Sequence, residues 1–255
     1  MPGQRRITIS MLPRESNAGV GSGCTIVVDT LRATSTIVAA LAAGAAEVIT
    51  VEDESRAREL ARETGALLAG EREGLPPAGF DAGNSPVELA GRVEPGQSVV
   101  LFTTNGTRAL CGAESEAVYA GALVNAAAIG REASGHSSVD IVCAGNAGGT
   151  RFSLEDFVTA AVIGRYIASQ EGDWRLYADN DGARLAARLF ASETDEAMLQ
   201  RAAELIRASD HAGRTRALGL EADIAWATQP NRFDIVPRVA EREPGMAVLR
   251  AGRAR

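Results

Sequence analysis

CTIVVD (24–29), followed directly by TLRATSTIVAALAAG (30–44), is the stretch that decides the fold of this 255-residue chain. The first segment is a run of apolar and β-branched residues that ends on an acid, and the second is rich in alanine. A continuously apolar run is typical of a strand buried on both faces, and an alanine-rich stretch after a short turn is typical of a helix. Together they predict one strand–helix unit of a parallel sheet.

The same order repeats along the first two thirds of the sequence. Five more apolar runs precede turns or helical stretches: AEVITVE (46–52), ALLAG (66–70), SVVLFT (98–103), EAVYAGAL (116–123) and VDIVCAG (139–145). The run RITIS near the N-terminus extends the series. Strands that alternate with helices predict an α/β fold with a mostly parallel sheet and helices on both faces.

The sequence changes character after Ser169. Three stretches with helical periodicity predict a helical C-terminal portion at about 170–230, and FDIVPRV (233–239) is predicted to be a last strand or an extended return. No low-complexity linker separates this portion from the rest. We therefore expect residues 1–255 to form a single α/β domain with a helical subdomain.

Charge and hydropathy limit the partners of the protein. The formal net charge is −7 and the pI is about 5.1, which disfavours binding to nucleic acid. The apolar runs are too short to span a bilayer, and the apolar stretch before Pro13 is too short for a secretory signal. We expect a cytoplasmic protein that binds a small molecule and neither nucleic acid nor membrane; a homo-oligomer is compatible with the sequence.

The basic and sulfur-containing residues exclude several chemistries. All 26 basic residues are arginine, so a Schiff-base lysine and a P-loop lysine are absent. Cys24, Cys111 and Cys143 form neither a CxxC pair nor a Cys-x5-Arg loop, which argues for core packing. His136 and His211 are too few for a histidine metal cage and lie in polar, loop-like surroundings. The chemistry that remains relies on carboxylates, arginine and Mg²⁺.

Acidic residues follow the predicted strands. Ligands of parallel α/β sheets bind beyond the carboxyl ends of the strands, where these residues are expected to gather. The candidate metal ligands are Asp29, Glu71, Glu155 and Asp156, and the candidate catalytic acids are Asp29, Glu71, Asp81 and Asp156. Carboxylates suit Mg²⁺, which also binds phosphate. Asp29 has a structural alternative, because an acid at this position also caps a helix.

Arginines and polar turns lie at the same edge of the predicted sheet. Arg32, Arg72 and Arg108 each follow a strand and are expected to surround an anionic substrate, because the guanidinium fork binds two oxygens of a phosphate. The remaining candidate substrate-binding residues are Asn84, Thr104, Asn105, Gly106, Thr107, Asn146, Gly148, Gly149 and Ser153. TTNGTRAL could instead be a capped helix start, and Ser153 with Asp156 a capping box. Four arginines on helical stretches should be solvated: Arg184, Arg188, Arg201 and Arg207.

Phosphoryl transfer is the chemistry that this set of residues favours, because it needs positioning and charge neutralisation more than a covalent nucleophile. Phosphatases that form a phospho-aspartate need a second Asp two positions after the first, and Leu31 stands there. We therefore expect water to attack phosphorus, with one of the acids as the base.

Four segments resemble the 2-phosphosulfolactate phosphatase family: VVDTLRATSTIVAAL, GEREGLPPAGFDAGNSP, TTNGTRAL and AGNAGGTRFSLEDFVTAA, with a weaker match in DIAWATQPNRFDIVP. The resemblance implies Mg²⁺-dependent hydrolysis of 2-phosphosulfolactate to sulfolactate and phosphate, a step toward coenzyme M, on a fold distinct from the common phosphatase folds. Two alternatives stay open. One is a phosphatase for another phosphorylated 2-hydroxy acid, such as phospholactate, and the other is a non-catalytic anion-binding protein.

Overall fold

The computed structural model describes residues 6–16, 23–169 and 178–252 and contains a nine-stranded sheet with the order β1-β7-β2-β6-β8-β9-β3-β5-β4. Two groups of parallel strands flank a hairpin. The first group is β1 (Arg6–Ser10), β7 (Ser138–Cys143), β2 (Cys24–Val28) and β6 (Ala117–Gly121); the second is β3 (Glu47–Val51), β5 (Ser98–Phe102) and β4 (Leu67–Gly70). The predicted α/β fold with a mostly parallel sheet is confirmed.

The hairpin of β8 (Val236–Glu243) and β9 (Met246–Gly252) joins the two groups. β8 pairs antiparallel with β6, and β9 pairs antiparallel with β3, so the two parallel groups run in opposite directions along the ladder. The sequence predicted only the start of this feature, in FDIVPRV, and not the strand that follows it. The antiparallel centre of the sheet is therefore a feature that only the structure shows.

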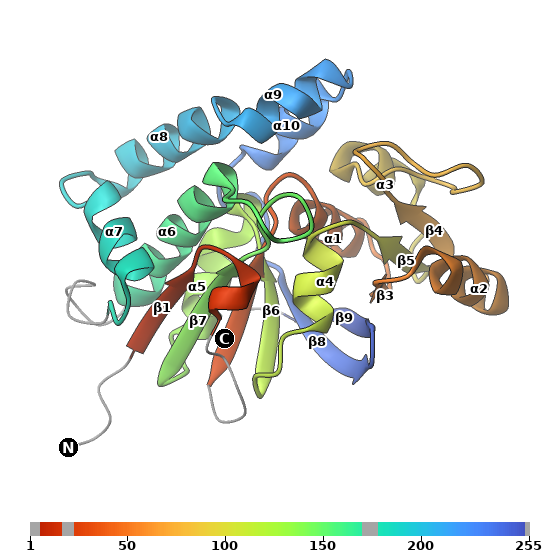
Figure 1. Ribbon diagram of the computed structural model, residues 1–255, viewed down its shortest axis with the longest axis horizontal. Helices are drawn as coiled ribbons and strands as arrows, with labels where there is room; N and C mark the ends of the chain where they lie inside the picture. Colours follow the sequence, from red (N-terminus) through yellow and green to blue (C-terminus); the bar gives the residue numbers. More distant parts are fainter. Residues whose placement is uncertain (1–5, 17–22, 170–177, 253–255) are drawn as a thin grey trace.

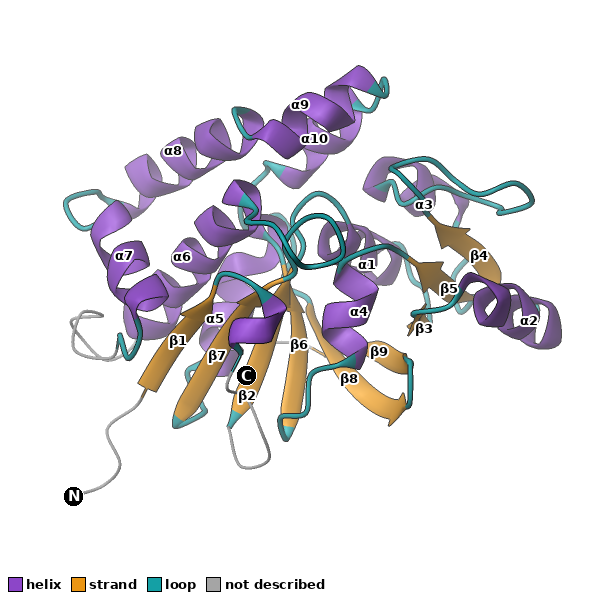
Figure 2. Ribbon diagram, in the orientation of Figure 1, coloured by secondary structure: helices purple, strands orange, loops and turns teal. Residues whose placement is uncertain are grey.

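Helices cover both faces of the sheet, as Figure 2 shows, with α4 in front of the first group and α5 and α6 behind it. In chain order the α-helices are α1 (Ala33–Ala42), α2 (Glu54–Thr64), α3 (Pro86–Arg92), α4 (Gly106–Cys111), α5 (Ala126–Ala133), α6 (Leu154–Ser169), α7 (Asp181–Leu189), α8 (Asp195–Arg207), α9 (Asp210–Ala217) and α10 (Glu221–Ala227). Two short 3₁₀ helices, η1 (Pro13–Glu15) and η2 (Leu123–Asn125), complete the described elements. None of the helices in the described ranges is long and apolar enough to cross a membrane.

Both faces of the strands are buried, in three apolar clusters. In β2, Ile26 and Val28 face the cluster of α5 and α6, while Val27 faces a central cluster. In β5, Leu101 faces the same central cluster and Val100 faces the outer cluster beneath α2. Residues of α1, α3 and α4 also belong to the central cluster, so it lies between the two strand groups. This double burial explains why the strands read as continuous apolar runs.

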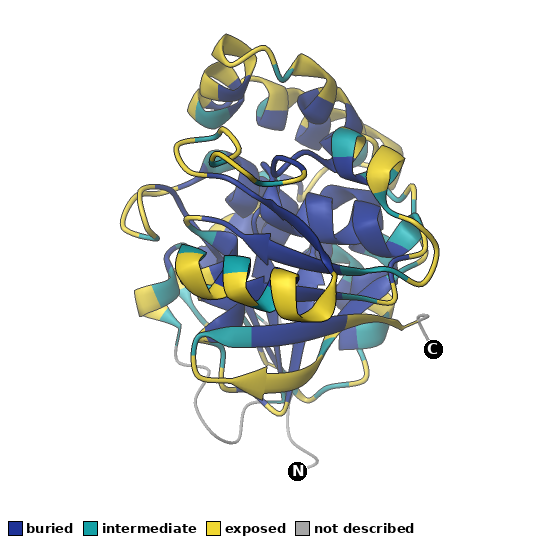
Figure 3. Ribbon diagram, turned by 90° about the vertical axis from the view of Figure 1, so that its right-hand side faces the viewer, coloured by how far each residue is buried: buried dark blue, intermediate teal, exposed yellow. Residues whose placement is uncertain are grey.

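The predicted helical C-terminal portion corresponds to α7–α10, although residues 170–177 lie outside the described residues. Of these four helices, α8, α9 and α10 lie along the top of the molecule in Figure 1 and α7 lies at its left side; exposed residues gather on the upper helices in Figure 3. Three of them begin at capping residues, Asn180, Thr194 and Ser209, whose side chains accept hydrogen bonds from the first turn. Ile206 and Ile224 belong to the same apolar cluster as Ile26, which fixes these helices on the sheet.

The central cluster should be the most sensitive part of the core. Leu101 is fully buried in it, whereas Leu185 on α7 is 53% exposed. We expect Leu101→Ala to lower the free energy of unfolding by about 2–5 kcal/mol, because it leaves a cavity. Leu185→Ala should change it by about 0.5 kcal/mol or less. Urea unfolding of both variants checks this, and equal effects would contradict the placement of Leu101 between the strand groups.

Candidate active site

A pocket of about 360 Å³ lies where the loops after β2, β4, β5 and β7 meet helix α9. Side chains from both parallel groups of strands therefore line one cavity, although the groups run in opposite directions. Its residues are polar and charged for the most part: Asp29, Arg32, Glu71, Glu73, Asn84, Thr104, Asn105, Asn146, Arg151, His211, Arg214 and Thr215, with Leu31, Gly74, Ala147 and Leu218.

Asp29 is the most deeply buried acid of this pocket, with 6% of its surface exposed. Its Oδ1 accepts a hydrogen bond from the N–H of Ala33, the first residue of α1, at 3.2 Å. Both interpretations of this residue thus hold, because it contacts the helix start and faces the pocket. A Cβ at Gly106 would come within 2.6 Å of its Oδ2, so only glycine fits beside the carboxylate.

The electrostatic surroundings of Asp29 disfavour its ionised form. Burial raises the pKa of Asp29 from 3.8 to about 6, and the charges of Glu71 and Glu155 act in the same direction, while His211 and the hydrogen bond from Ala33 oppose it. Such a carboxylate is stabilised by any cation that enters the pocket.

Glu71 follows β4 and connects its own loop with the loop after β5. Its Oε1 accepts from the N–H of Thr104 and its Oε2 from the N–H of Gly74, both at 2.8 Å. Each carboxylate oxygen has a second lone pair, so Glu71 can still bind a ligand in the pocket. Asp29 and Glu71 are the two predicted metal ligands that the structure brings to the same cavity.

Asp156 and Glu155 are buried at the start of α6 and do not line the pocket floor with these two acids. Asp156 accepts hydrogen bonds from the N–H groups of Thr30 at 2.9 Å and Gly145 at 3.1 Å, and so fastens two site loops together. Burial raises the pKa of Asp156 well above its ordinary value, and the charges of Asp29 and Glu155 add to this. Glu155 instead faces His211, with 3.0 Å between Oε1 and Nδ1.

The predicted set of four metal-binding carboxylates is therefore not assembled. In the described parts of the chain, no group of three or more acids, histidines or cysteines is arranged to hold a metal ion. Asp81 is also elsewhere: it is exposed, and its carboxylate accepts from the N–H of Leu68 within β4 at 2.8 Å. Asp156 is only 2% exposed, and neither its carboxylate nor that of Asp81 lines the pocket that Asp29 and Glu71 share.

The arginines differ most from expectation. Arg32 reaches the pocket, but its guanidinium is paired with buried Asp223 and donates to the carbonyl of Gly74, both at 2.7 Å. Arg72 is exposed and paired with Glu54. Arg108 is exposed on α4, and it is not among the lining residues. The four arginines predicted to be solvated, Arg184, Arg188, Arg201 and Arg207, are exposed as expected.

The predicted polar turns divide into lining and supporting residues. Asn84, Thr104, Asn105 and Asn146 line the pocket, and Asn105 also accepts from the N–H of Gly148 at 2.8 Å. The supporting residues are Thr107, whose hydroxyl donates to the carbonyl of Thr103, Ser153, whose Oγ accepts from the N–H of Asp156, and Gly148 and Gly149, which turn the loop with positive φ. Ser153 is thus a helix cap.

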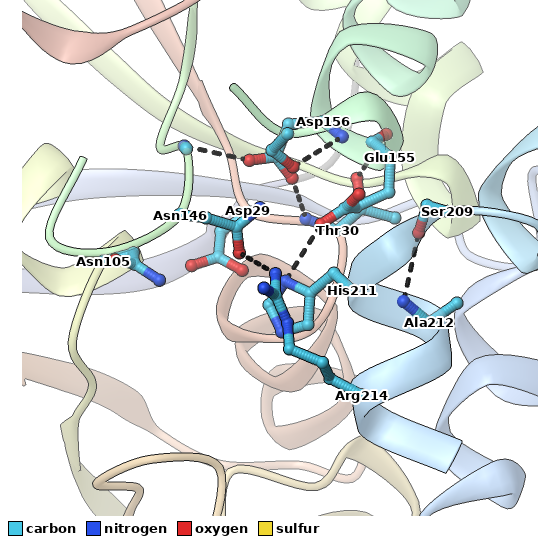
Figure 4. A network of polar contacts seen from close by, with 12 residues as sticks. Asp29, Thr30, Asn105, Asn146, Glu155, Asp156, Ser209, His211, Ala212 and Arg214 are labelled. Carbon is cyan, nitrogen blue, oxygen red and sulfur yellow. Dashed lines mark hydrogen bonds and ion pairs between the residues drawn. The ribbon is translucent and has the colours of Figure 1, made fainter. Parts of the chain in front are cut away.

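Sequence reasoning missed the contribution of α9. His211 and Arg214 on this helix, and Arg151 on the loop after β7, line the pocket. Figure 4 shows Asp29, Asn146, His211 and Arg214 pointing toward one another, and Nη2 of Arg214 donates to Oδ1 of Asn146 at 3.2 Å. The available signal was the spacing, because residues three apart lie on one face of a helix. What the sequence could not show is which loop that face contacts.

Fold and pocket together define an α/β protein that receives a small anionic molecule among acids and arginines at the strand ends. A profile of the 2-phosphosulpholactate phosphatase family matches residues 11–242, and the chain belongs to this family. The earlier resemblance is thereby confirmed over most of the sequence.

Relatives with the same description are similar over most of their length. The chain is 39% identical to the probable 2-phosphosulfolactate phosphatase of Thermotoga petrophila over 213 residues, which is 83% of this chain and 87% of the relative. It is 39% identical to the one of Deinococcus radiodurans, covering 91% and 92% of the two chains. For the one of Symbiobacterium thermophilum the identity is 35%, over 94% and 99%.

The raised pKa of Asp29 predicts that this residue destabilises the metal-free protein. Its folded-state pKa of about 6 lies above the ordinary value of 3.8, so its ionisation costs stability as the pH rises through this range. In EDTA at pH 7.5, Asp29→Asn should raise the free energy of unfolding by about 2–3 kcal/mol, and by about half as much at pH 5. Urea unfolding at both pH values measures this; a variant less stable than the wild type at pH 7.5 would contradict it.

Proposed function

We propose that this protein hydrolyses 2-phosphosulfolactate to 3-sulfolactate and phosphate, with Mg²⁺ as its cofactor, as in a step of coenzyme M biosynthesis. The family and the names of the relatives support the substrate class. The observation that carries the proposal is the composition of the pocket, in which Asp29 and Glu71 lie in one cavity with Arg151 and Arg214, two arginines that form no ion pair with an acid of the described residues.

The cations suit a substrate with several negative groups. Phosphate, carboxylate and sulfonate all need hydrogen-bond donors and positive charge. Arg151 and Arg214 line the pocket, and neither forms an ion pair with an acid of the described residues. Charge-assisted hydrogen bonds from such arginines are strong because the ligand need not displace a carboxylate. Arg32, by contrast, is already bound to Asp223 and positions the loop after β2.

The two carboxylates of the pocket, Asp29 and Glu71, suit Mg²⁺, which usually has few protein ligands. Mg²⁺ binds through one or two carboxylates, keeps several waters and takes substrate phosphate oxygens as further ligands. Asp29 and Glu71 would hold it, and the pKa of Asp29, raised by burial, marks a carboxylate that gains from a nearby cation. Bound there, the ion would supply charge neutralisation for the phosphoryl group.

The protein residues position the reactants. Arg151, Arg214 and the amide of Asn146 bind the anionic groups of the ester. A water molecule attacks phosphorus, and Asp29 or Glu71 accepts its proton. The three cysteines are buried, and burial raises the pKa of Cys24 to about 12 and that of Cys111 to about 11, so a thiolate nucleophile is disfavoured.

The buried acids favour a phosphatase over a non-catalytic anion-binding protein. A non-catalytic anion-binding protein would gain nothing from Asp29, because an ionised acid beside the ligand repels it and burial of the acid costs stability. A phosphatase for another phosphorylated 2-hydroxy acid would use the same acids and arginines. The choice between these substrates is a matter of relative rates.

Phosphate release from a panel of esters tests the proposal. The panel contains 2-phosphosulfolactate, 2-phospholactate and an alkyl phosphate without acid groups. We expect the highest kcat/KM with 2-phosphosulfolactate, loss of activity in EDTA, and recovery when Mg²⁺ is added. Activity that survives exhaustive chelation would refute the metal, and a preference for the ester without acid groups would refute the substrate class.

Replacing the acids separates the site from its surroundings. Asp29→Asn and Glu71→Gln should each lower kcat/KM by roughly 10²-fold or more, because charge next to the phosphoryl group is lost. Asp81→Asn is the matched control, since its side chain is exposed, lies outside the pocket and contacts only the β4 backbone in the hydrogen bond described above. Kinetics and thermal unfolding are measured together. If Asp81→Asn lowered kcat/KM as much as the other two substitutions, the assignment of Asp29 and Glu71 as the catalytic acids would be contradicted.

A further inference from the structure

Glu155 is a buried acid whose carboxylate forms an ion pair with a histidine of the pocket. It is 2% exposed at the start of α6, and its Oε1 lies 3.0 Å from Nδ1 of His211. Burial acts to raise the pKa of Glu155, but the contact with His211 outweighs it and leaves the pKa below its ordinary value. A buried carboxylate is costly unless it is paired, so this ion pair holds the imidazole ring of His211 beside the start of α6.

His211 reaches from α9 into the pocket. The side chain is 24% exposed and lines the same cavity as Asp29, Glu71 and Asn146. Nδ1 of His211 faces Glu155, a contact that a dashed line marks in Figure 4. Nε2 is therefore the ring nitrogen left for a ligand. A carboxylate that holds one ring nitrogen sets the proton on that nitrogen and aims the other, which is how active sites orient a histidine.

We infer that His211 is the catalytic general acid of this phosphatase, with Glu155 as its positioning residue. The inference rests on the proposed phosphatase function but not on the identity of the ester. The sequence alone does not identify this pair, because Glu155 fits the pattern of the candidate metal ligands and His211 lies in a polar stretch without a motif.

The oxygen of water forms a bond to phosphorus while the bond between phosphorus and the ester oxygen breaks. The electron pair of that bond goes to the ester oxygen, which takes the proton from Nε2 of His211 and leaves as an alcohol. The attacking water gives one proton to a pocket carboxylate, and this proton returns through solvent to His211. Alkyl alcohols are poor leaving groups as anions, so this proton is needed.

Other charged groups around the ring define the competing role. Asp29 and Glu71 lie on the loops after β2 and β4, Arg151 on the loop after β7, and Arg214 one turn further along α9. Arg151 and Arg214 line the same pocket and form no ion pair with an acid of the described residues, so His211 could serve beside them as a further cation that only binds phosphate. The two roles differ in what they do to rates and to ground-state binding, so kinetics can separate them.

The test compares His211→Gln and Glu155→Gln on two kinds of ester. The alkyl esters are 2-phosphosulfolactate and 2-phospholactate, and the aryl ester is p-nitrophenyl phosphate, whose leaving group departs without a proton. We expect His211→Gln to lower kcat on alkyl esters by roughly 10²–10⁴-fold, the usual contribution of a general acid. The loss on the aryl ester should be less than about tenfold, and Glu155→Gln should show the same pattern with smaller losses.

The inhibition constant of inorganic phosphate supplies the second readout. A general acid acts in the transition state, so this constant should change by less than about threefold in both variants. His136→Gln is the matched control, because His136 is the other histidine of the sequence and lines a separate cavity with Tyr119 and Arg238. Circular dichroism and thermal unfolding confirm that each variant is folded.

The outcomes distinguish this inference from the proposed function. Equal losses on alkyl and aryl esters together with weaker phosphate inhibition would show that His211 only binds the anion, and unchanged kcat would show that it does neither. If the wild type does not hydrolyse the aryl ester, the two roles are distinguished by comparing the change in kcat with the change in the inhibition constant of phosphate. A lower kcat with an unchanged inhibition constant supports the general acid, and a weaker inhibition supports the binding role. A wild type that prefers 2-phospholactate refutes the proposed substrate and leaves the general acid to be judged on that ester. A wild type that hydrolyses no ester overturns both.

Discussion

The central apolar layer between the two parallel groups of strands is the constraint on which the rest of the structure depends. Strands of the two groups run in opposite directions along the hydrogen-bonded ladder, and in a flat sheet their carboxyl ends would lie at opposite edges. They instead share one core, in which Val27 of β2 and Leu101 of β5 belong to the same cluster. The loops that follow both groups therefore reach one pocket, and neither group alone would supply all of its acids.

Buried charges then fasten the pocket loops to one another. Asp156 accepts hydrogen bonds from N–H groups of the loops after β2 and β7, and Glu71 accepts them from the loops after β4 and β5. Arg32 forms an ion pair with Asp223 of α10. Asp223 also accepts from the hydroxyl of Ser85 at 2.5 Å, which ties the loop before α3 to the same pair. Removing one partner of such a pair leaves an uncompensated charge in the interior, so these contacts specify the loop positions more than they add stability.

The same burial that orders the site also stores energy in it. Desolvation and neighbouring acids raise the pKa values of Asp29 and Asp156, because water cannot stabilise the ionised form of either carboxyl group there. A cation and the polar groups of a substrate relieve this cost when they bind. Active sites commonly trade stability for function in this way, since acids placed for chemistry are not placed for folding.

The sequence by itself determined the class of fold, the strand–helix order and several residues of the pocket. Apolar runs of β-branched residues specify doubly buried strands, and polar residues just after them fall at the strand ends. Asp29, Glu71, Thr104, Asn105 and Asn146 were found from this local pattern, and Asn84 from the Gly/Pro-rich loop between two strands. Tertiary structure decided how far each side chain is already engaged. The carboxylates of Asp81 and Asp156 accept hydrogen bonds from backbone N–H groups, and Arg32 and Arg72 form ion pairs with carboxylates. The packing of α9 across the pocket places His211 and Arg214 among its lining residues. These outcomes depend on contacts between residues far apart in the chain, such as the 191 positions that separate Arg32 from Asp223, and no local pattern carries that information.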